Sequence, residues 1–181
     1  CTIMPPLFDC SVDLACPASL DSAKSGEKGR KEIAADVARH IHFCHSHGVL
    51  GAADYGRANT SNVSPNERRG VDETVTVRTA GQVYSTSQHR TLNKDSKELD
   101  FVKIIHTGDI ESVNVTACGA EKKEKENLVR LVREARERGK KTVVLANGKK
   151  GVREALDAEC DAIEQGYNMG EENLEIMASR K

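Results

Sequence analysis

Three side chains of this sequence stand where short apolar segments run into loops, and all three could do acid–base or metal chemistry. Asp13 closes the run at residues 4–14 (MPPLFDCSVDL), and Lys103 and His106 lie in residues 100–108 (DFVKIIHTG). In consecutive β/α units the catalytic groups sit where a strand passes into its loop. We therefore take Lys103 and Asp13 as candidate catalytic residues and His106 as a candidate ligand contact.

Two further apolar strands near the C-terminal end each run into a polar, glycine-containing turn and then a helix. They are residues 140–148 (KKTVVLANG) and 161–166 (DAIEQG). Glycine-containing loops at this place can receive a phosphate or carboxylate, so Asn147 is a second candidate ligand contact. Strand periodicity predicts that Leu145 and Gln165 lie at the C-terminal ends of adjacent parallel strands.

Strands and helices alternate along the chain, which predicts an α/β fold in a single domain over residues 1–181. Helical spacing of apolar residues favours outer helices near residues 33–48, 127–139, 151–160 and 170–179, with Leu174 and Met177 pointing inward. The polar segment 84–97 is interpreted as a loop. We expect an open, partial (β/α)8 barrel of about six parallel strands, at residues 4–14, 48–56, 74–81, 100–108, 140–148 and 161–166.

These strand segments resemble, in the same order, those of the amidohydrolase superfamily, in its branch of imidazolonepropionase- and prolidase-like metal-dependent hydrolases. The first strand of that branch commonly reads P-G-L-I-D-C-H-V-H-L, and its two metal-binding histidines fall on Ser11 and Asp13. Strands similar to V-x-V-H-A-N-G and D-S-I-E-H-G-Y place the next two histidines on Leu145 and Gln165. The resemblance implies a barrel whose metal-ligand histidines are replaced at these four barrel-mouth positions.

The fourth strand of the family carries a lysine that is carbamylated in many members and bridges two metals, and the resemblance places it on Lys103. The alternative is a lysine that reaches solvent or pairs with Asp13 or Glu164. We favour the alternative, because two metals hold a carbamate in place and most of their ligands are replaced here. We expect no metal and no cofactor, with zinc or another divalent metal as the alternative.

Four histidines cluster in eight residues at His40, His42, His45 and His47. On a helix, His40 and His47 share one side and the other two share another, so the four do not converge on one ion. We interpret them as a solvated helix end near the negative pole of the helix dipole.

Charge, hydropathy and cysteine usage set the remaining expectations. The net charge of −1 gives no electrostatic case for nucleic acid or for an anionic membrane. No apolar run approaches the roughly 18 residues of a membrane span. Six scattered cysteines without a pairing pattern indicate reduced thiols. We expect a soluble, cytoplasmic protein.

Chain length bears on partners and function. A closed (β/α)8 barrel takes about 250 residues, so 181 residues should leave exposed strand edges near residues 7–14 and 162–166. Such edges favour a homo-oligomer or a complementing subunit. Our first hypothesis is a degenerate amidohydrolase relative without metal-dependent hydrolysis. The alternatives are a metal-dependent hydrolase of amide-type C–N bonds completed by a partner chain, and a metal-free module that binds a small molecule.

Overall fold

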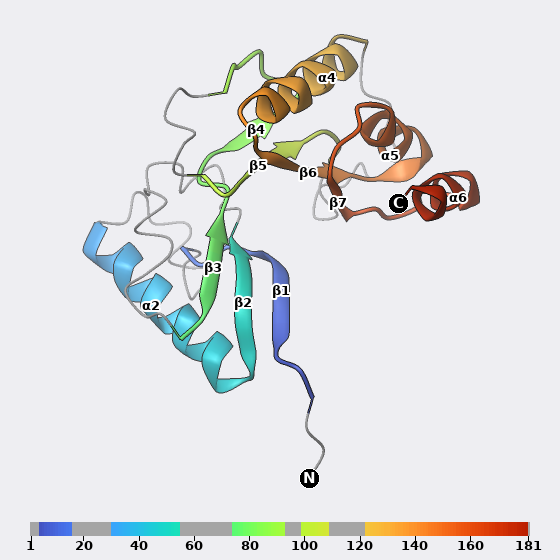
Figure 1. Ribbon diagram of the computed structural model, residues 1–181. Helices are drawn as coiled ribbons and strands as arrows, with labels where there is room; N and C mark the ends of the chain where they lie inside the picture. Colours follow the sequence, from blue (N-terminus) through green and yellow to red (C-terminus); the bar gives the residue numbers. More distant parts are fainter. Residues whose placement is uncertain (1–3, 16–29, 55–73, 93–98, 109–121, 181) are drawn as a thin grey trace. The chain divides into compact units, whose positions relative to one another are not determined.

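The structure is a computed structural model that describes residues 4–15, 30–54, 74–92, 99–108 and 122–180 (Figure 1). The chain divides into two compact units. The first comprises Cys1–Val83 and Glu98–Asp100, and the second comprises Tyr84–Lys97 and Phe101–Lys181. Each unit has its own sheet and its own core. This division into compact units does not test the expected single domain over residues 1–181, which stays a prediction.

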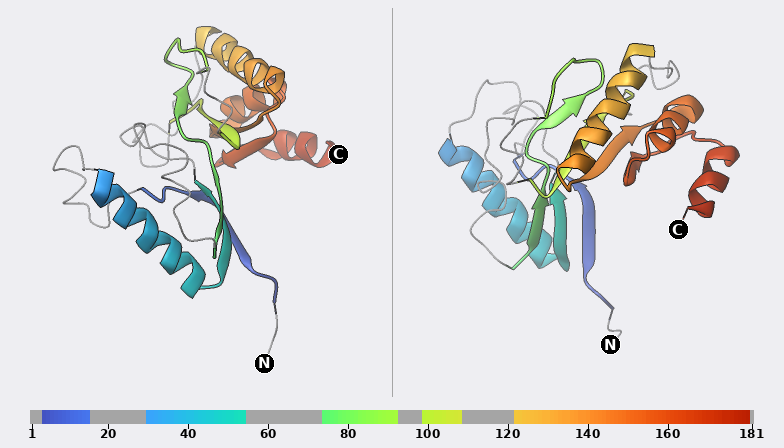
Figure 2. Two further views of the ribbon diagram at one scale, coloured as in Figure 1. Left: turned by 60° about the vertical axis from the view of Figure 1, so that its left-hand side comes forward. Right: turned by 45° about the horizontal axis from the view of Figure 1, so that its top comes forward.

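In its described residues, the first unit is a three-stranded parallel sheet with one helix against it. Its strands are β1 (Leu7–Val12), β2 (Val49–Asp54) and β3 (Thr76–Thr79), in the order β1-β2-β3. Helix α2 (Arg30–Ser46) runs along one face of this sheet (Figure 2). The two are joined by a buried apolar cluster of Leu14, Ala15, Val37, Ile41, Ala52, Val75 and Val77.

The second unit is a four-stranded sheet in the order β4-β5-β6-β7, in which β5, β6 and β7 are parallel. Its elements are β4 (Val83–Ser85), β5 (Phe101–Ile105), α4 (Lys122–Glu137), β6 (Lys141–Ala146), α5 (Gly148–Asp157), β7 (Ala162–Gln165) and α6 (Glu171–Ser179). Helices α4 and α5 cover one face, because Val102, Ile104 and Val144 share a core with Leu131 and Val152.

The α/β class and the six predicted parallel strands are confirmed, and each strand lies within its predicted segment. The segment 84–97 was expected to be a loop, and this is wrong at its start. Strand β4 reaches Ser85 there, and the Thr86 N–H donates to the Ile105 carbonyl at 3.0 Å. Tyr84 is buried in the core. Val83 and Tyr84 are the only two apolar residues between Gln82 and Thr91, which is too weak a pattern to predict a strand.

Helix α6 is present, but its predicted apolar face is wrong. Leu174 and Met177 are 53% and 38% exposed, whereas Asn173 is buried. The Asn173 side-chain amide donates to the carbonyls of Lys149 and Met169, at 2.8 and 2.7 Å. Polar bonds therefore orient this short helix and leave two of its large apolar side chains outside.

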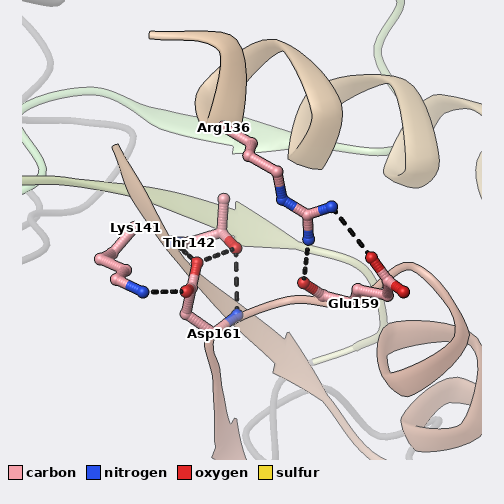
Figure 3. A network of polar contacts seen from close by, with 5 residues as sticks. All are labelled: Arg136, Lys141, Thr142, Glu159 and Asp161. Atoms are coloured by element: carbon pink, nitrogen blue, oxygen red, sulfur yellow. Dashed lines mark hydrogen bonds and ion pairs between the residues drawn. The ribbon is translucent and has the colours of Figure 1, made fainter. Parts of the chain in front are cut away.

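A polar network holds the start of β7 against β6 (Figure 3). The Asp161 carboxylate accepts hydrogen bonds from the Thr142 N–H at 2.8 Å and from Lys141 Nζ at 2.7 Å. Arg136 of α4 donates to the carboxylate and the carbonyl of Glu159, each at 2.9 Å. The network ties α4, β6 and β7 together before either strand reaches its C-terminal end.

None of the helices in the described ranges is long and apolar enough to cross a membrane.

Candidate functional site

The register of β5, β6 and β7 separates two faces of the second sheet. Lys103 lies opposite Val143, and Leu145 lies opposite Ile105 on one side and Glu164 on the other. Paired residues of parallel strands share a face, and alternate residues change face. These side chains therefore belong to the face turned away from α4 and α5, which we call the site face (Phe101, Lys103, Ile105, Val143, Leu145, Ala162 and Glu164).

Lys103 and Glu164 form an ion pair on the site face, and both side chains are buried, with 1% and 9% exposed. They stand on β5 and β7, two strands apart, which corresponds to roughly 9–10 Å between backbones. Both side chains must therefore extend across β6, where Val143 and Leu145 lie. Of the three alternatives left open for Lys103, namely solvent, Asp13 and Glu164, the structure shows Glu164.

Leu145 and Gln165 lie at the C-terminal ends of adjacent parallel strands, as predicted. In the strand register Gln165 lies opposite Ala146, and it is Glu164 that lies opposite Leu145. Gln165 has a φ of 68°, in the left-handed region, so the strand ends at this residue. Its side-chain oxygen accepts a hydrogen bond from Asn147 at 2.7 Å.

Asn147 joins three strand ends and is fully buried. Its side-chain amide nitrogen also donates to the Gly108 carbonyl at 3.1 Å, and its side-chain oxygen accepts the Tyr167 N–H at 2.9 Å. The backbone N–H of Asn147 donates to Thr107 Oγ1 at 2.8 Å. These bonds give Asn147 a positioning role at the ends of β5, β6 and β7, while a ligand contact stays a prediction.

His106 is buried between β4 and α5. Its Nε2 lies 3.0 Å from Glu154 Oε2, and its Nδ1 lies 3.2 Å from Thr86 Oγ1. A carboxylate only accepts, so Nε2 donates to Glu154. The order hydroxyl, imidazole, carboxylate is that of a hydrolytic triad. Thr86, however, is only 1% exposed, so its hydroxyl is not accessible to a substrate. The three side chains therefore have a structural role, in which they hold β4, β5 and α5 together.

Sequence reasoning missed Glu154 as the partner of His106. A signal for it was present, because Glu154 stands beside Ala155 and Leu156 and two residues after Val152, on the helix face that packs inward. An acidic residue on an inward face needs a buried partner, and a histidine at the end of the adjacent strand is a natural one.

Ser11 and Asp13, the other two of the four positions that the resemblance assigns to replaced metal-ligand histidines, lie in the first unit. Ser11 lies on β1 and is exposed, and its N–H donates to Asp9 Oδ1 at 3.0 Å. Asp13 follows β1, is half-buried, and accepts the Ala15 N–H at 3.2 Å. Catalytic roles for Asp13 and Lys103 stay predictions.

The site face does not fit a zinc ion as it stands. Leu145 offers no ligand atom, the Glu164 carboxylate pairs with Lys103, and the Gln165 amide oxygen accepts from Asn147. Among the described residues, no three His, Cys, Asp or Glu side chains are grouped so that they could hold a metal ion. Zinc sites take imidazole, thiolate or carboxylate ligands, four in a structural site and three in a catalytic one.

Two of the four clustered histidines, His40 in α2 and His47 directly after it, form local contacts with backbone carbonyls. His40 Nδ1 lies 2.7 Å from the Leu14 carbonyl, and His47 Nδ1 lies 2.8 Å from the Phe43 carbonyl. Because carbonyls accept, both Nδ1 atoms carry a proton and donate.

Two described cysteines have thiols that resist ionisation. Burial raises the pKa of Cys160 to about 11, and the same effect, with the nearby Asp9 charge, raises the pKa of Cys44. A thiol with a raised pKa is a poor nucleophile, because the thiolate is the reactive form.

No family model matches the sequence, and neither does any curated protein. Solved structures are similar in fold. A Xaa-Pro dipeptidase with bound methionine in its active site has a TM-score of 0.73 at 19% identity, over 96% of this chain and 51% of its own. The ochratoxinase of A. niger has a TM-score of 0.73 at 17% identity, over 97% of this chain and 50% of its own.

A structure described as an amidohydrolase has a TM-score of 0.64 at 15% identity, over 97% of this chain and 51% of its own. At such identities the similarity shows the fold alone. The chain has the fold of these amidohydrolase- and prolidase-type structures, and it spans about half of their length. The partial barrel expected from the sequence is thereby confirmed.

Proposed function

We propose that this chain is a non-hydrolytic relative of the amidohydrolase-fold enzymes, a pseudoenzyme. The observation that carries the proposal is the Lys103–Glu164 ion pair, which crosses β6 on the site face, where Glu164 lies opposite Leu145. A reducing, cytoplasmic setting belongs to the same proposal, because Cys10, Cys44 and Cys160 are free thiols.

The ion pair and Leu145 act against metal hydrolysis in different ways. A metal-dependent hydrolase needs several imidazole or carboxylate ligands and an open coordination position for water. Leu145 removes one donor, and pairing with Lys103 engages the carboxylate next to it. Carbamylation starts from a free amine that attacks carbon dioxide, whereas a lysine that pairs with a carboxylate is held as the ammonium ion.

Hydrolysis assays test the proposal. Xaa-Pro dipeptides and N-acyl amino acids are incubated with the purified chain, with and without added zinc. We expect no rate above that of buffer, and the same result for Lys103→Met. A rate that depends on zinc, disappears with a chelator and is lost in Lys103→Met would overturn the proposal.

A hydrolase completed by a partner chain is the second candidate. It is favoured by the similar structures, which are about twice as long and include a dipeptidase and an ochratoxinase. In this case the same assay would show activity only in the complex purified under native conditions. That activity would be lost when the complex carries Lys103→Met, and absent from the isolated chain.

A further inference from the structure

We propose that Lys103 is a carboxylate-binding site which Glu164 fills from within the chain, so that a small organic carboxylate and Glu164 compete for one ammonium group. The inference deepens the proposed function and rests on it in one respect, namely that the site face carries no metal. It names the ligand class, a monocarboxylate, that the face would accept.

The first step is that the buried ammonium group of Lys103 requires a counter-ion. Its side chain is 1% exposed and lies on the same face as Ile105, Val143 and Leu145, which are apolar. A buried ammonium ion without a counter-ion costs several kcal/mol. Whatever occupies this place must therefore be an anion that accepts hydrogen bonds from an ammonium group, as a carboxylate does.

The second step is the position of Glu164, which makes it replaceable. It stands on β7, the last strand in the order β4-β5-β6-β7, and this strand is only four residues long. Gln165, the last residue of this strand, and Gly166, which follows it, both have a positive φ. A short edge strand opens at a lower free energy cost than the strands inside a sheet.

The third step is chemical equivalence. The group that Glu164 presents to Lys103 is a carboxylate on a flexible stem, and formate or acetate presents the same group without the stem. The intramolecular carboxylate has the advantage of a high effective concentration, on the order of millimolar or above. Removing it should therefore expose a site that free carboxylates can fill.

The experiment measures the thermal stability of four proteins in chelator-treated buffer, with rising sodium formate at an ionic strength held constant with chloride. The proteins are the wild type, Glu164→Ala, Glu164→Gln, and Glu164→Ala combined with Lys103→Met. Formamide, which has the same shape and no charge, is the matched ligand control.

We expect formate to raise the melting temperature of Glu164→Ala along a saturating curve, as for a ligand that binds only the folded state. The apparent affinity should be at least about tenfold higher than in the wild type. Formamide should have no such effect, and the Lys103→Met combination should not respond to formate. Glu164→Gln keeps the side-chain volume. If Glu164→Ala does not fold, the formate response of Glu164→Gln is compared with that of the wild type instead.

Equal responses to formate and chloride in both Glu164 variants would overturn the inference, and so would a formate response that survives Lys103→Met. The test is independent of the proposed function. Zinc-dependent hydrolysis by the wild type would contradict the proposed function without changing the formate response in chelator. An absent formate response together with absent hydrolysis would contradict this inference alone.

Discussion

Burying Lys103 costs free energy that its pairing with Glu164 offsets. Removing one partner of a buried ion pair leaves an uncompensated charge and costs about 3–5 kcal/mol, whereas replacing both with apolar residues is often neutral or stabilising. Both side chains are buried, so this rule applies to them with little solvent screening. The stability of the site face therefore depends on the two residues together.

A double-mutant cycle measures this dependence. We expect Lys103→Met and Glu164→Leu each to lower the free energy of unfolding by about 3 kcal/mol, and the combined variant to lie within about 1 kcal/mol of the wild type. Urea denaturation gives the three differences. Single-variant effects that simply add would show that the two side chains do not interact in the folded protein.

Asn147 is the second residue whose replacement should be costly. Asn147→Ala removes three side-chain hydrogen bonds at a buried place and leaves the Tyr167 N–H without its acceptor. We expect a loss of about 3 kcal/mol in the free energy of unfolding. Gln88→Ala, at an exposed position, is the control and should change it by less than about 0.5 kcal/mol. An Asn147→Ala protein as stable as this control would contradict the positioning role.

At the scale of the elements, Asp161 fastens β7 to β6 and does so in a pH-dependent manner. Partial burial alone would raise the pKa of its carboxyl group, but hydrogen bonds from Lys141 and Thr142 outweigh it and hold the pKa below its usual range. A lowered pKa stabilises the fold above the unfolded-state pKa of about 3.9. This contribution is lost as the pH falls through the lower, folded-state pKa.

Asp161→Asn should therefore make the loss of stability below about pH 4 less steep. Its cost at neutral pH comes from the lost ion pair with Lys141. Urea midpoints between pH 2 and 7 measure both effects, with Glu175→Gln on the exposed side of α6 as the control. An acid limb as steep as that of the control would show that Asp161 does not contribute to it.

The elements were predictable where their pattern is strong. Buried strands such as β5 and β6 are short apolar runs that end in glycine turns, and α4 has Leu128, Leu131 and Val132 at helical spacing. The prediction failed where polar contacts determine which face of a helix is buried, as they do in α6 through Asn173. In the site, Lys103 and its two possible carboxylate partners were visible in the sequence. Which carboxylate it meets depends on the register of three strands, and the sequence does not contain that information locally.

At the scale of the whole molecule, β1 is the edge strand of the first sheet among the strands that the structure describes. Leu7 and Phe8 are 49% and 69% exposed, although the Phe8 ring lies over Gly51, where any larger residue would collide with it. A free edge flanked by apolar side chains is a template for pairing with another chain. We propose that the chain forms a homo-oligomer or binds a complementing subunit through this edge.

Light scattering across micromolar concentrations tests association. We expect a mass above that of one chain, which falls toward the monomer on dilution and in Phe8→Lys, because a charge at an edge opposes strand pairing. Leu174→Lys, on the exposed side of α6, is the control for added charge and should leave the mass unchanged. A wild-type chain that is monomeric at all concentrations would contradict the homo-oligomer.

The absence of a catalytic metal is the central claim, and zinc stoichiometry tests it most directly. The chain and a variant that restores the family pattern (Ser11→His, Asp13→His, Leu145→His, Gln165→His) are grown with zinc, purified without chelator, and analysed for metal per chain. We predict well under one zinc per chain for the natural sequence and a higher content for the variant. One tightly held zinc per natural chain, lost in Lys103→Met, would contradict the account.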